Sequence, residues 1–161
     1  MLNLHTLATD AAVKAGKILL KYYKNAYEIH DKGYHNPVTT ADHEADAFLK
    51  QFLLEATPGF GWLSEETVDS PDRLDKEFVW IVDPLDGTKE FIEGVPNFVT
   101  SIGLVQNGIP ILGVLYNPIT EELFRTDAAG VVWYLDQQAE LCQETALKDV
   151  GCLNSRSETR R

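Results

Sequence analysis

Two aspartates that could bind a cation, Asp83 and Asp86, follow an apolar run at residues 78–82 that is typical of a buried strand. Pro84 interrupts a strand's hydrogen-bond ladder and Gly87 permits a tight turn, so we expect both carboxylates at the end of this strand. No basic residue lies between them to offset their repulsion. Carboxylate oxygens are preferred ligands of Mg²⁺, and a bound cation would relieve that repulsion. The alternative interpretation is an ordinary Asx turn.

Three further carboxylates occur in loops or near a helix start. Glu65 and Glu66 follow a short apolar segment at residues 61–63, and Asp42 lies near the start of a predicted helix. Taken alone, an acidic pair in a loop indicates a solvated surface. Asp42 alone would favour the helix dipole. These residues therefore gain a functional interpretation only in combination with the aspartates at the strand end.

The combined set predicts a site for a phosphate ester. Asp83, Asp86 and one of the two glutamates would hold two Mg²⁺ ions, with the Leu85 carbonyl and waters completing the coordination. Two metals about 3.5–4 Å apart can clamp the attacking and leaving oxygens of such an ester. An anionic substrate can therefore bind an acidic protein when metal ions stand between them.

The sequence also contains residues that could position and activate a nucleophilic water. A helical turn that begins after Gly87 would direct free backbone N–H groups toward the phosphate. The Thr88 hydroxyl would orient an attacking water if a carboxylate accepted the hydroxyl proton, and Asp42 is the candidate acceptor. The predicted chemistry is hydrolysis of a phosphate monoester.

Elements that could position these residues are evident from the apolar spacing. Residues 4–23 read as an amphipathic helix, and a second helix begins after Thr39 or Thr40 and ends before Pro58. The strand segments are 61–63, 78–82, 98–105, 109–116, 123–126 and 131–135. Asn107-Gly108 and Ala129-Gly130 mark hairpin turns between the later ones. We expect an α+β domain in which two helices pack on one face of a largely antiparallel sheet.

Composition limits the class of protein. The chain has 161 residues, 44% of them hydrophobic, which is enough for one domain with a core. The formal charge of −11 argues against binding a nucleic acid polymer. No run approaches the roughly 18 apolar residues of a transmembrane segment. Cys142 and Cys152 lack zinc-ligand spacing and are interpreted as free thiols, so we expect a cytoplasmic protein.

Three segments carry a resemblance to a known family. Residues 79–88, Val-Trp-Ile-Val-Asp-Pro-Leu-Asp-Gly-Thr, resemble the signature of the inositol monophosphatase superfamily, the lithium-sensitive, Mg²⁺-dependent phosphatases. Ser64-Glu65-Glu66-Thr67 is similar to the upstream glutamate motif of that family, and Pro-Val-Thr-Thr-Ala-Asp at 37–42 to its first acidic motif. The resemblance extends through essentially the whole chain. It implies the N-terminal half of an inositol-monophosphatase-like fold.

The resemblance also implies roles for individual residues. Glu65, Asp83 and the Leu85 carbonyl match ligands of a first metal, and Asp83 and Asp86 match ligands of a second. Thr88 and Asp42 match the pair that activates water. Glu65 is also assigned to the catalytic residues. The residues that match the phosphate site are Glu65, Leu85, Asp86, Gly87 and Thr88. Lys89 is either a nearby positive charge or a solvated side chain.

One branch of the family is the more similar in two segments. Lys89-Glu90-Phe91-Ile92 and residues 110–118 resemble the 3′(2′),5′-bisphosphate nucleotidases. The implied reaction converts 3′-phosphoadenosine 5′-phosphate to AMP and phosphate, which is a step connected with sulfate assimilation. An inositol or other sugar monophosphate is the alternative substrate. A non-catalytic remnant that binds metal or phosphate is the alternative from another functional class.

Full-length members of the family have two domains. We expect residues 1–153 to form the first, and Asn154-Ser155-Arg156-Ser157 in the segment 154–161 to resemble the start of a missing second domain. Asp127-Ala128-Ala129-Gly130 looks like an aspartate motif of that second domain. Thr126 stands in place of the motif's tryptophan, and a hairpin turn is predicted there, so we interpret the match as coincidental. A sheet face or edge left uncovered would favour a homodimer.

Overall fold

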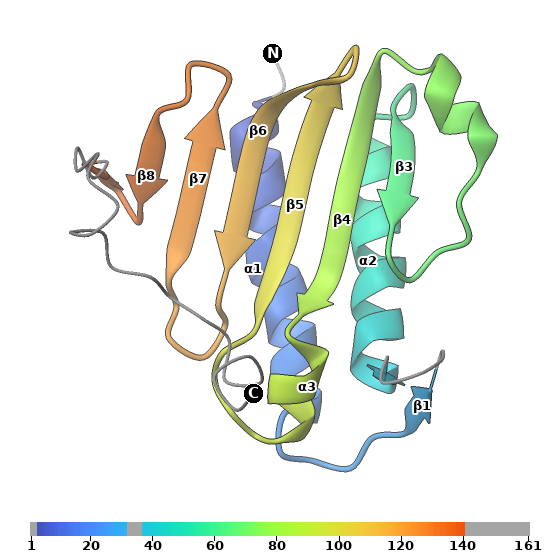
Figure 1. The fold of residues 1–161 in the computed structure, drawn as a ribbon, viewed down its shortest axis with the longest axis vertical. Helices are drawn as coiled ribbons and strands as arrows, with labels where there is room; N and C mark the ends of the chain where they lie inside the picture. The colour runs from blue at the N-terminus through green and yellow to red at the C-terminus, as the bar shows by residue number, and fades with distance from the viewer. Residues whose placement is uncertain (1–2, 32–36, 141–161) are drawn as a thin grey trace, which may run out of the picture.

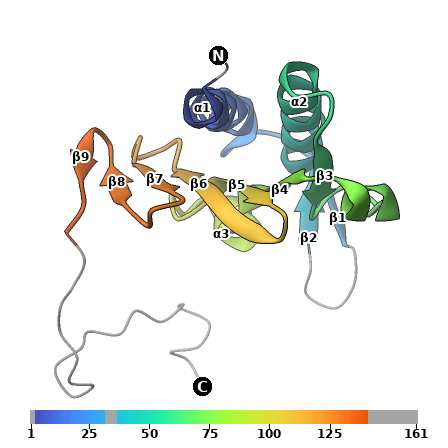
Figure 2. The same ribbon diagram turned by 90° about the horizontal axis from the view of Figure 1, so that it is seen from above.

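The computed structural model describes residues 3–31 and 37–140 of the chain. Two long helices, α1 (Leu4–Tyr22) and α2 (Thr40–Ala56), lie side by side on one face of a large sheet. Viewed from above, they form a separate layer over that sheet (Figure 2). The predicted α+β architecture, with two helices on one sheet face, is confirmed. Cys142, Cys152 and the segment 154–161 lie outside the described residues.

Within the described residues, the large sheet has seven strands in the order β3-β4-β5-β6-β7-β8-β9. The edge strand β3 runs parallel to β4, and every other neighbouring pair is antiparallel (Figure 1). Sequential strands are therefore neighbours throughout. The strands are β3 (Gly61–Ser64), β4 (Phe78–Asp86), β5 (Val99–Gln106), β6 (Ile109–Tyr116), β7 (Leu123–Asp127), β8 (Val132–Tyr134) and β9 (Gln137–Gln138).

The main core lies between the helices and the sheet. Trp80 is fully buried there, and its Nε1 donates a hydrogen bond to Thr57 Oγ1 at 3.0 Å, so its polar atom is satisfied. Helix α1 can lie close to β6 because residue 16 is glycine: a Cβ at that position would stand 2.8 Å from the Tyr116 ring. A second cluster, around Leu19, Leu85 and Phe91, packs below it, next to the ends of the strands. The core thus ties α1 and α2 to the strands that carry the site.

Strand β4 is longer than the sequence predicts. Pro84 was expected to end it after residue 82, but the strand continues to Asp86 with a register shift between Asp83 and Asp86. Proline is tolerated in strands at such irregularities, where its missing N–H is not required. The buried Pro84 carbonyl is satisfied from the side, because Thr100 Oγ1 donates to it at 3.1 Å. The prediction that Pro84 ends the strand was wrong.

Several short elements were not predicted. Strands β1 (Ile29–Asp31) and β2 (Pro37–Thr39) form a small antiparallel sheet within a polar stretch. A 3₁₀ helix, η1 (Pro71–Asp75), connects β3 to β4, and β9 lies where the apolar pattern weakens. The short helix α3 (Thr88–Ile92) follows β4 and confirms the helical turn expected after Gly87. Elements this short carry too few residues for a periodic pattern.

Candidate active site

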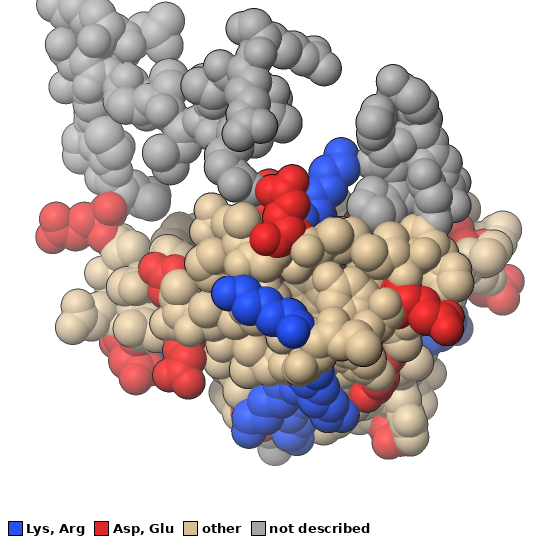
Figure 3. Space-filling model, turned by 90° about the horizontal axis from the view of Figure 1, so that it is seen from below, with Lys and Arg blue, Asp and Glu red and all other residues tan. Residues whose placement is uncertain are grey.

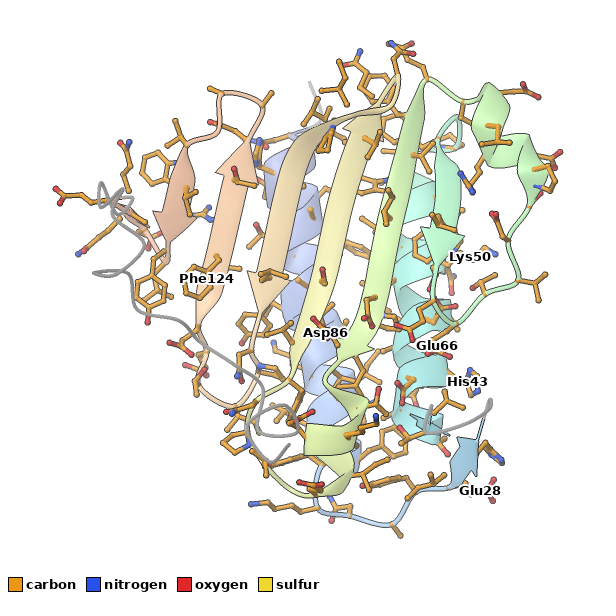
Figure 4. All side chains as sticks on the ribbon, in the orientation of Figure 1. Glu28, His43, Lys50, Glu66, Asp86 and Phe124 are labelled. Atoms are coloured by element: carbon orange, nitrogen blue, oxygen red, sulfur yellow. The ribbon has the colours of Figure 1, made fainter. Side chains whose placement is uncertain are left out.

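The parallel pairing of β3 with β4 brings two of the three predicted motifs together. Ser64 lies opposite Val82 in this parallel register, so the C-terminal ends of both strands point to the same end of the sheet. The Glu65 backbone N–H donates to the Val82 carbonyl at 3.3 Å, which places the loop after β3 beside the end of β4. Figure 4 shows Asp86 at that end of β4 and Glu66 just beyond the end of β3.

Asp83 has the most strongly shifted pKa of the carboxyl groups at this end of the sheet. Burial, followed by the charge of Glu65, a hydrogen bond with the Glu65 side chain and the charge of Asp86, raises its pKa from 3.8 to about 7. The Leu85 backbone N–H donates to Asp83 Oδ1 at 3.1 Å and acts in the opposite direction. Three carboxyl groups therefore interact here. A group of this kind favours either a shared proton or a cation.

The predicted metal ligands are only partly gathered. Glu65 contacts Asp83, whereas the Asp86 side chain is exposed at the strand end. In the described part of the chain, no three His, Cys, Asp or Glu side chains are already arranged as a metal cluster. Asp86 can lower its energy by pointing into solvent, because a like charge is repelled by the Glu65–Asp83 pair. The oxygen donors and the raised pKa of Asp83 fit a hard cation such as Mg²⁺.

Helix α2 carries Asp42, the residue that the sequence suggested as a base, in its first turn. Asp42 is 1% exposed and closes a capping box, since its Oδ2 accepts from Thr39 N at 2.8 Å and Thr39 Oγ1 at 2.5 Å. Its Oδ1 accepts from Thr88 Oγ1 at 3.2 Å. Burial raises the pKa of Asp42, while the hydrogen bonds from Thr39 and Thr88 lower it. Asp42 therefore both caps the helix and faces the predicted nucleophile-orienting hydroxyl.

The Thr88 hydroxyl has one proton and two acceptors within reach. Besides Asp42 Oδ1, the Leu85 carbonyl lies 3.1 Å from Thr88 Oγ1. A hydroxyl donates one hydrogen bond and can accept two. When the proton points at Asp42, the Leu85 carbonyl is free for another partner and the Thr88 oxygen can accept from a water. The geometry expected of a water-orienting pair is present.

Gly87 joins the strand to α3 in a conformation that suits glycine. Its φ of +99° lies in the left-handed region, and a Cβ there would stand 2.7 Å from the Asn97 carbonyl oxygen. The backbone of residues 85–88 can therefore turn sharply from β4 into the helix. Lys89 is exposed, as its solvated interpretation predicted.

The structure also shows residues at the site that were not predicted. Asp46, one helical turn after Asp42, is 7% exposed and accepts hydrogen bonds from the hydroxyls of Ser64 and Thr67. His43 Nδ1 lies 3.9 Å from Glu66 Oε2, whose side chain is 5% exposed (Figure 4). The i, i+4 spacing of Asp42 and Asp46 on one helix face was the available signal for Asp46.

Two surface features complete the description. Asp127 accepts from the backbone N–H groups of Ala129 and Val131 in the β7–β8 turn, which is consistent with a structural role for that aspartate. Seen from the site end, lysine and arginine side chains lie in separate groups among acidic and uncharged ones (Figure 3). None of the described helices has the length and apolar character that crossing a membrane requires.

Known proteins share both the sequence and the fold. An inositol-1-monophosphatase of Mesorhizobium japonicum is 35% identical over 147 residues, covering 89% of this chain and 55% of the relative. One of Caulobacter vibrioides is 42% identical over 118 residues, covering 71% and 46%. The crystal structure of the extragenic suppressor protein suhB from Bartonella henselae matches with a TM-score of 0.81 at 33% identity, covering 88% of this chain and 55% of that one.

The chain spans about half the length of the curated relatives it matches. Almost all of the chain nevertheless matches one family: the family model described as "Inositol monophosphatase family" matches residues 2–160. That range includes the Glu65 loop, the β4 aspartates and the Thr88–Asp42 pair. This chain belongs to the inositol monophosphatase family.

Proposed function

We propose that the site at the ends of β3 and β4 is the active site of a Mg²⁺-dependent phosphomonoesterase. One observation carries the proposal: Thr88 Oγ1 lies 3.2 Å from Asp42 Oδ1, directly after the strand end where Asp83 contacts Glu65. A hydroxyl paired with a buried carboxylate can orient water. The neighbouring acidic groups can hold the cations that a phosphate needs. Both functions are required for hydrolysis of a phosphate monoester.

In this proposal each residue has a defined task. Glu65, Asp83, Asp86 and the Leu85 carbonyl would hold Mg²⁺, in one site or two. When bound, Mg²⁺ supplies neutralisation of the phosphate charge. Thr88 passes its hydroxyl proton toward Asp42 and accepts a hydrogen bond from the attacking water, which aligns that water with phosphorus.

The proposed substrate is an inositol monophosphate. Relatives at 35% and 42% identity carry the name inositol-1-monophosphatase, which supports this ester over 3′-phosphoadenosine 5′-phosphate. Residues 89–92 suggested the nucleotidase branch, but packing in the core explains the aromatic residue of this segment. Phe91 is fully buried and packs against Tyr23 and Phe98, with ring centroids 5.6 and 5.1 Å away. Phe91 therefore serves the core and carries no information about the substrate.

The residues of the second nucleotidase-like segment, 110–118, also have structural roles. Most of it is strand β6, and Asn117 Nδ2 donates to the Pro96 carbonyl at 2.8 Å. Asn117 Oδ1 accepts from the backbone N–H of Ile119 at 2.9 Å. This segment is explained by packing and turn formation, so the branch resemblance is weak support for a nucleotide substrate.

The test is Mg²⁺-dependent phosphate release by the 161-residue chain, comparing inositol 1-phosphate with 3′-phosphoadenosine 5′-phosphate. We expect the inositol ester to be hydrolysed with the higher kcat/KM, and EDTA to abolish release. Asp83→Asn should also abolish it. Asp127→Asn, which changes an acidic residue in the β7–β8 turn, is the matched control and should leave the rate unchanged.

Other outcomes separate the alternatives. Faster hydrolysis of the nucleotide would retain the phosphatase and reject the inositol substrate. Mg²⁺ binding by calorimetry, without release from either ester by a folded sample, would favour a binding remnant. Release that persists in EDTA would contradict the proposed chemistry altogether.

A further inference from the structure

The loop that carries Glu65 is held at both ends by a single carboxylate. Asp46 Oδ1 accepts a hydrogen bond from Ser64 Oγ, the last residue of β3. Asp46 Oδ2 accepts from Thr67 Oγ1 at 2.5 Å. The residues between these two anchors are Glu65 and Glu66, so a movement of Asp46 would be transmitted to both.

A further hydrogen bond extends this network to the loop backbone. Ser64 Oγ donates to Asp46 and accepts from the Glu66 N–H at 3.2 Å. The backbone direction at Glu66 is therefore set by a hydroxyl that Asp46 itself orients. On the opposite side, the Glu65 N–H is bound to the Val82 carbonyl on β4. The loop is fixed between α2 and β4, with Glu65 directed toward Asp83.

Helix α2 places Asp46 one turn from Asp42, on the same buried face. Asp42 reaches Thr88 after β4, and Asp46 reaches the loop after β3. Since a helix is stiff over one turn, these two contacts set the distance between the Glu65 loop and the Thr88 hydroxyl.

We propose that Asp46 is a positioning residue that orients Glu65 for cation binding through the hydroxyls of Ser64 and Thr67. The inference rests on the proposed function for its metal, and on the hydrogen bonds above for its geometry. Neighbours that orient metal ligands commonly affect metal affinity by about 10–100-fold when removed. We expect a loss of that size here.

Thr67→Val is the sharpest variant, because it removes one hydroxyl while keeping the shape of the side chain. Its matched control is Thr57→Val, which removes a buried hydroxyl that bonds Trp80 Nε1 and Leu53 O, away from the site. Calorimetric titration with Mg²⁺ alone should show weaker binding by about 10-fold or more in Thr67→Val and Asp46→Ala. Thr57→Val should bind as the unsubstituted chain does, and Thr67→Ser should restore affinity.

A second readout does not require metal. Backbone ¹⁵N relaxation of the metal-free chain should show lower order parameters at Glu65 and Glu66 in Thr67→Val and Asp46→Ala, but not in Thr57→Val. Unchanged order parameters at these two amides would overturn the proposal. So would a loss of Mg²⁺ affinity that is equal in Thr57→Val and Thr67→Val.

The two readouts keep this inference separate from the proposed function. If the unsubstituted chain shows neither Mg²⁺ binding nor phosphate release, the proposed function fails, and the relaxation data still decide whether Asp46 orders the loop. If the chain hydrolyses the ester and Thr67→Val does so with the same Mg²⁺ dependence, the proposed function stands and the positioning role fails.

Discussion

Thr88 Oγ1 and Asp42 Oδ1 lie 3.2 Å apart although 46 positions separate the two residues in the chain. Asp42 is fixed in advance by the capping box at the start of α2, and Thr88 begins α3 directly after Gly87. The contact therefore joins the start of one helix to the start of another across the second apolar cluster. It fixes where a water could be oriented relative to the carboxylates of β4.

This pair predicts a specific kinetic defect. Thr88→Val should lower kcat for the phosphate ester by about 10²–10⁴-fold, because the residue that aligns the attacking water is lost. KM should change little, since the side chain is proposed to act on the water. Steady-state kinetics with inositol 1-phosphate would measure both constants. Thr88→Ser keeps the hydroxyl and should retain most of the activity, and a rate for Thr88→Val equal to that of the serine variant would refute the role.

The turn at Gly87 predicts a stability effect with a clean control. Gly87→Ala combines a left-handed φ of +99° with a Cβ 2.7 Å from the Asn97 carbonyl oxygen. Gly108 has a φ of +82° but open space around its Cβ position. Gly108→Ala should cost about 1–2 kcal/mol of unfolding free energy from its conformation alone. Gly87→Ala should cost more by about 1–3 kcal/mol, because it adds overpacking.

Urea denaturation followed by circular dichroism would measure both free energies. The comparison isolates the close contacts with Asn97 and Phe98, since both substitutions carry a similar conformational penalty. Equal losses in the two variants would show that the backbone around Gly87 relaxes freely.

Asp83 predicts how stability depends on pH in the absence of metal. Its pKa is about 7 in the folded chain and 3.8 when unperturbed, so the native state binds the proton more tightly. Stability then falls with rising pH, because the unfolded state binds fewer protons between these values. In EDTA, Asp83→Asn should become progressively more stable than the unsubstituted chain from pH 5 to pH 8.

Added Mg²⁺ should reverse this order at pH 8, since only the unsubstituted chain offers the Asp83 carboxylate to the cation. Urea midpoints at several pH values, with and without metal, provide the measurement. A difference between the two proteins that stays constant across this range would rule out Asp83 as the group responsible.

Thr100 predicts a link between the β4 irregularity and the site. Thr100→Val would leave the buried Pro84 carbonyl without its donor, at a cost of about 1–3 kcal/mol. The backbone between Asp83 and Asp86 should also loosen, which would weaken Mg²⁺ binding. Thermal unfolding and calorimetry would report the two effects, and Thr100→Ser should restore both. Loss of stability with unchanged Mg²⁺ affinity would limit Thr100 to a structural role.

Local patterns predicted most of the regular structure. The helix expected at residues 4–23 is observed at Leu4–Tyr22, and the second begins after Thr39 as its capping signal indicated. The hairpin predicted at Asn107-Gly108 is present, and both residues adopt the positive φ that this turn requires, at 49° and 82°. Each of these signals depends on residues a few positions apart, so the chain itself contains it. The acidic residues of the site were also named from sequence motifs.

Tertiary structure alone decided how those residues meet. The sequence by itself determined that Asp42, Glu65, Asp83 and Thr88 are present on helix and strand ends, but their relative positions depend on α2 packing against β4. The continuation of β4 past Pro84 is accompanied by a hydrogen bond from Thr100 on the neighbouring strand. The role of Asp46 emerged only when α2 was placed beside the loop after β3. These contacts join segments distant in sequence, and their energies depend on burial and distance, which no local pattern encodes.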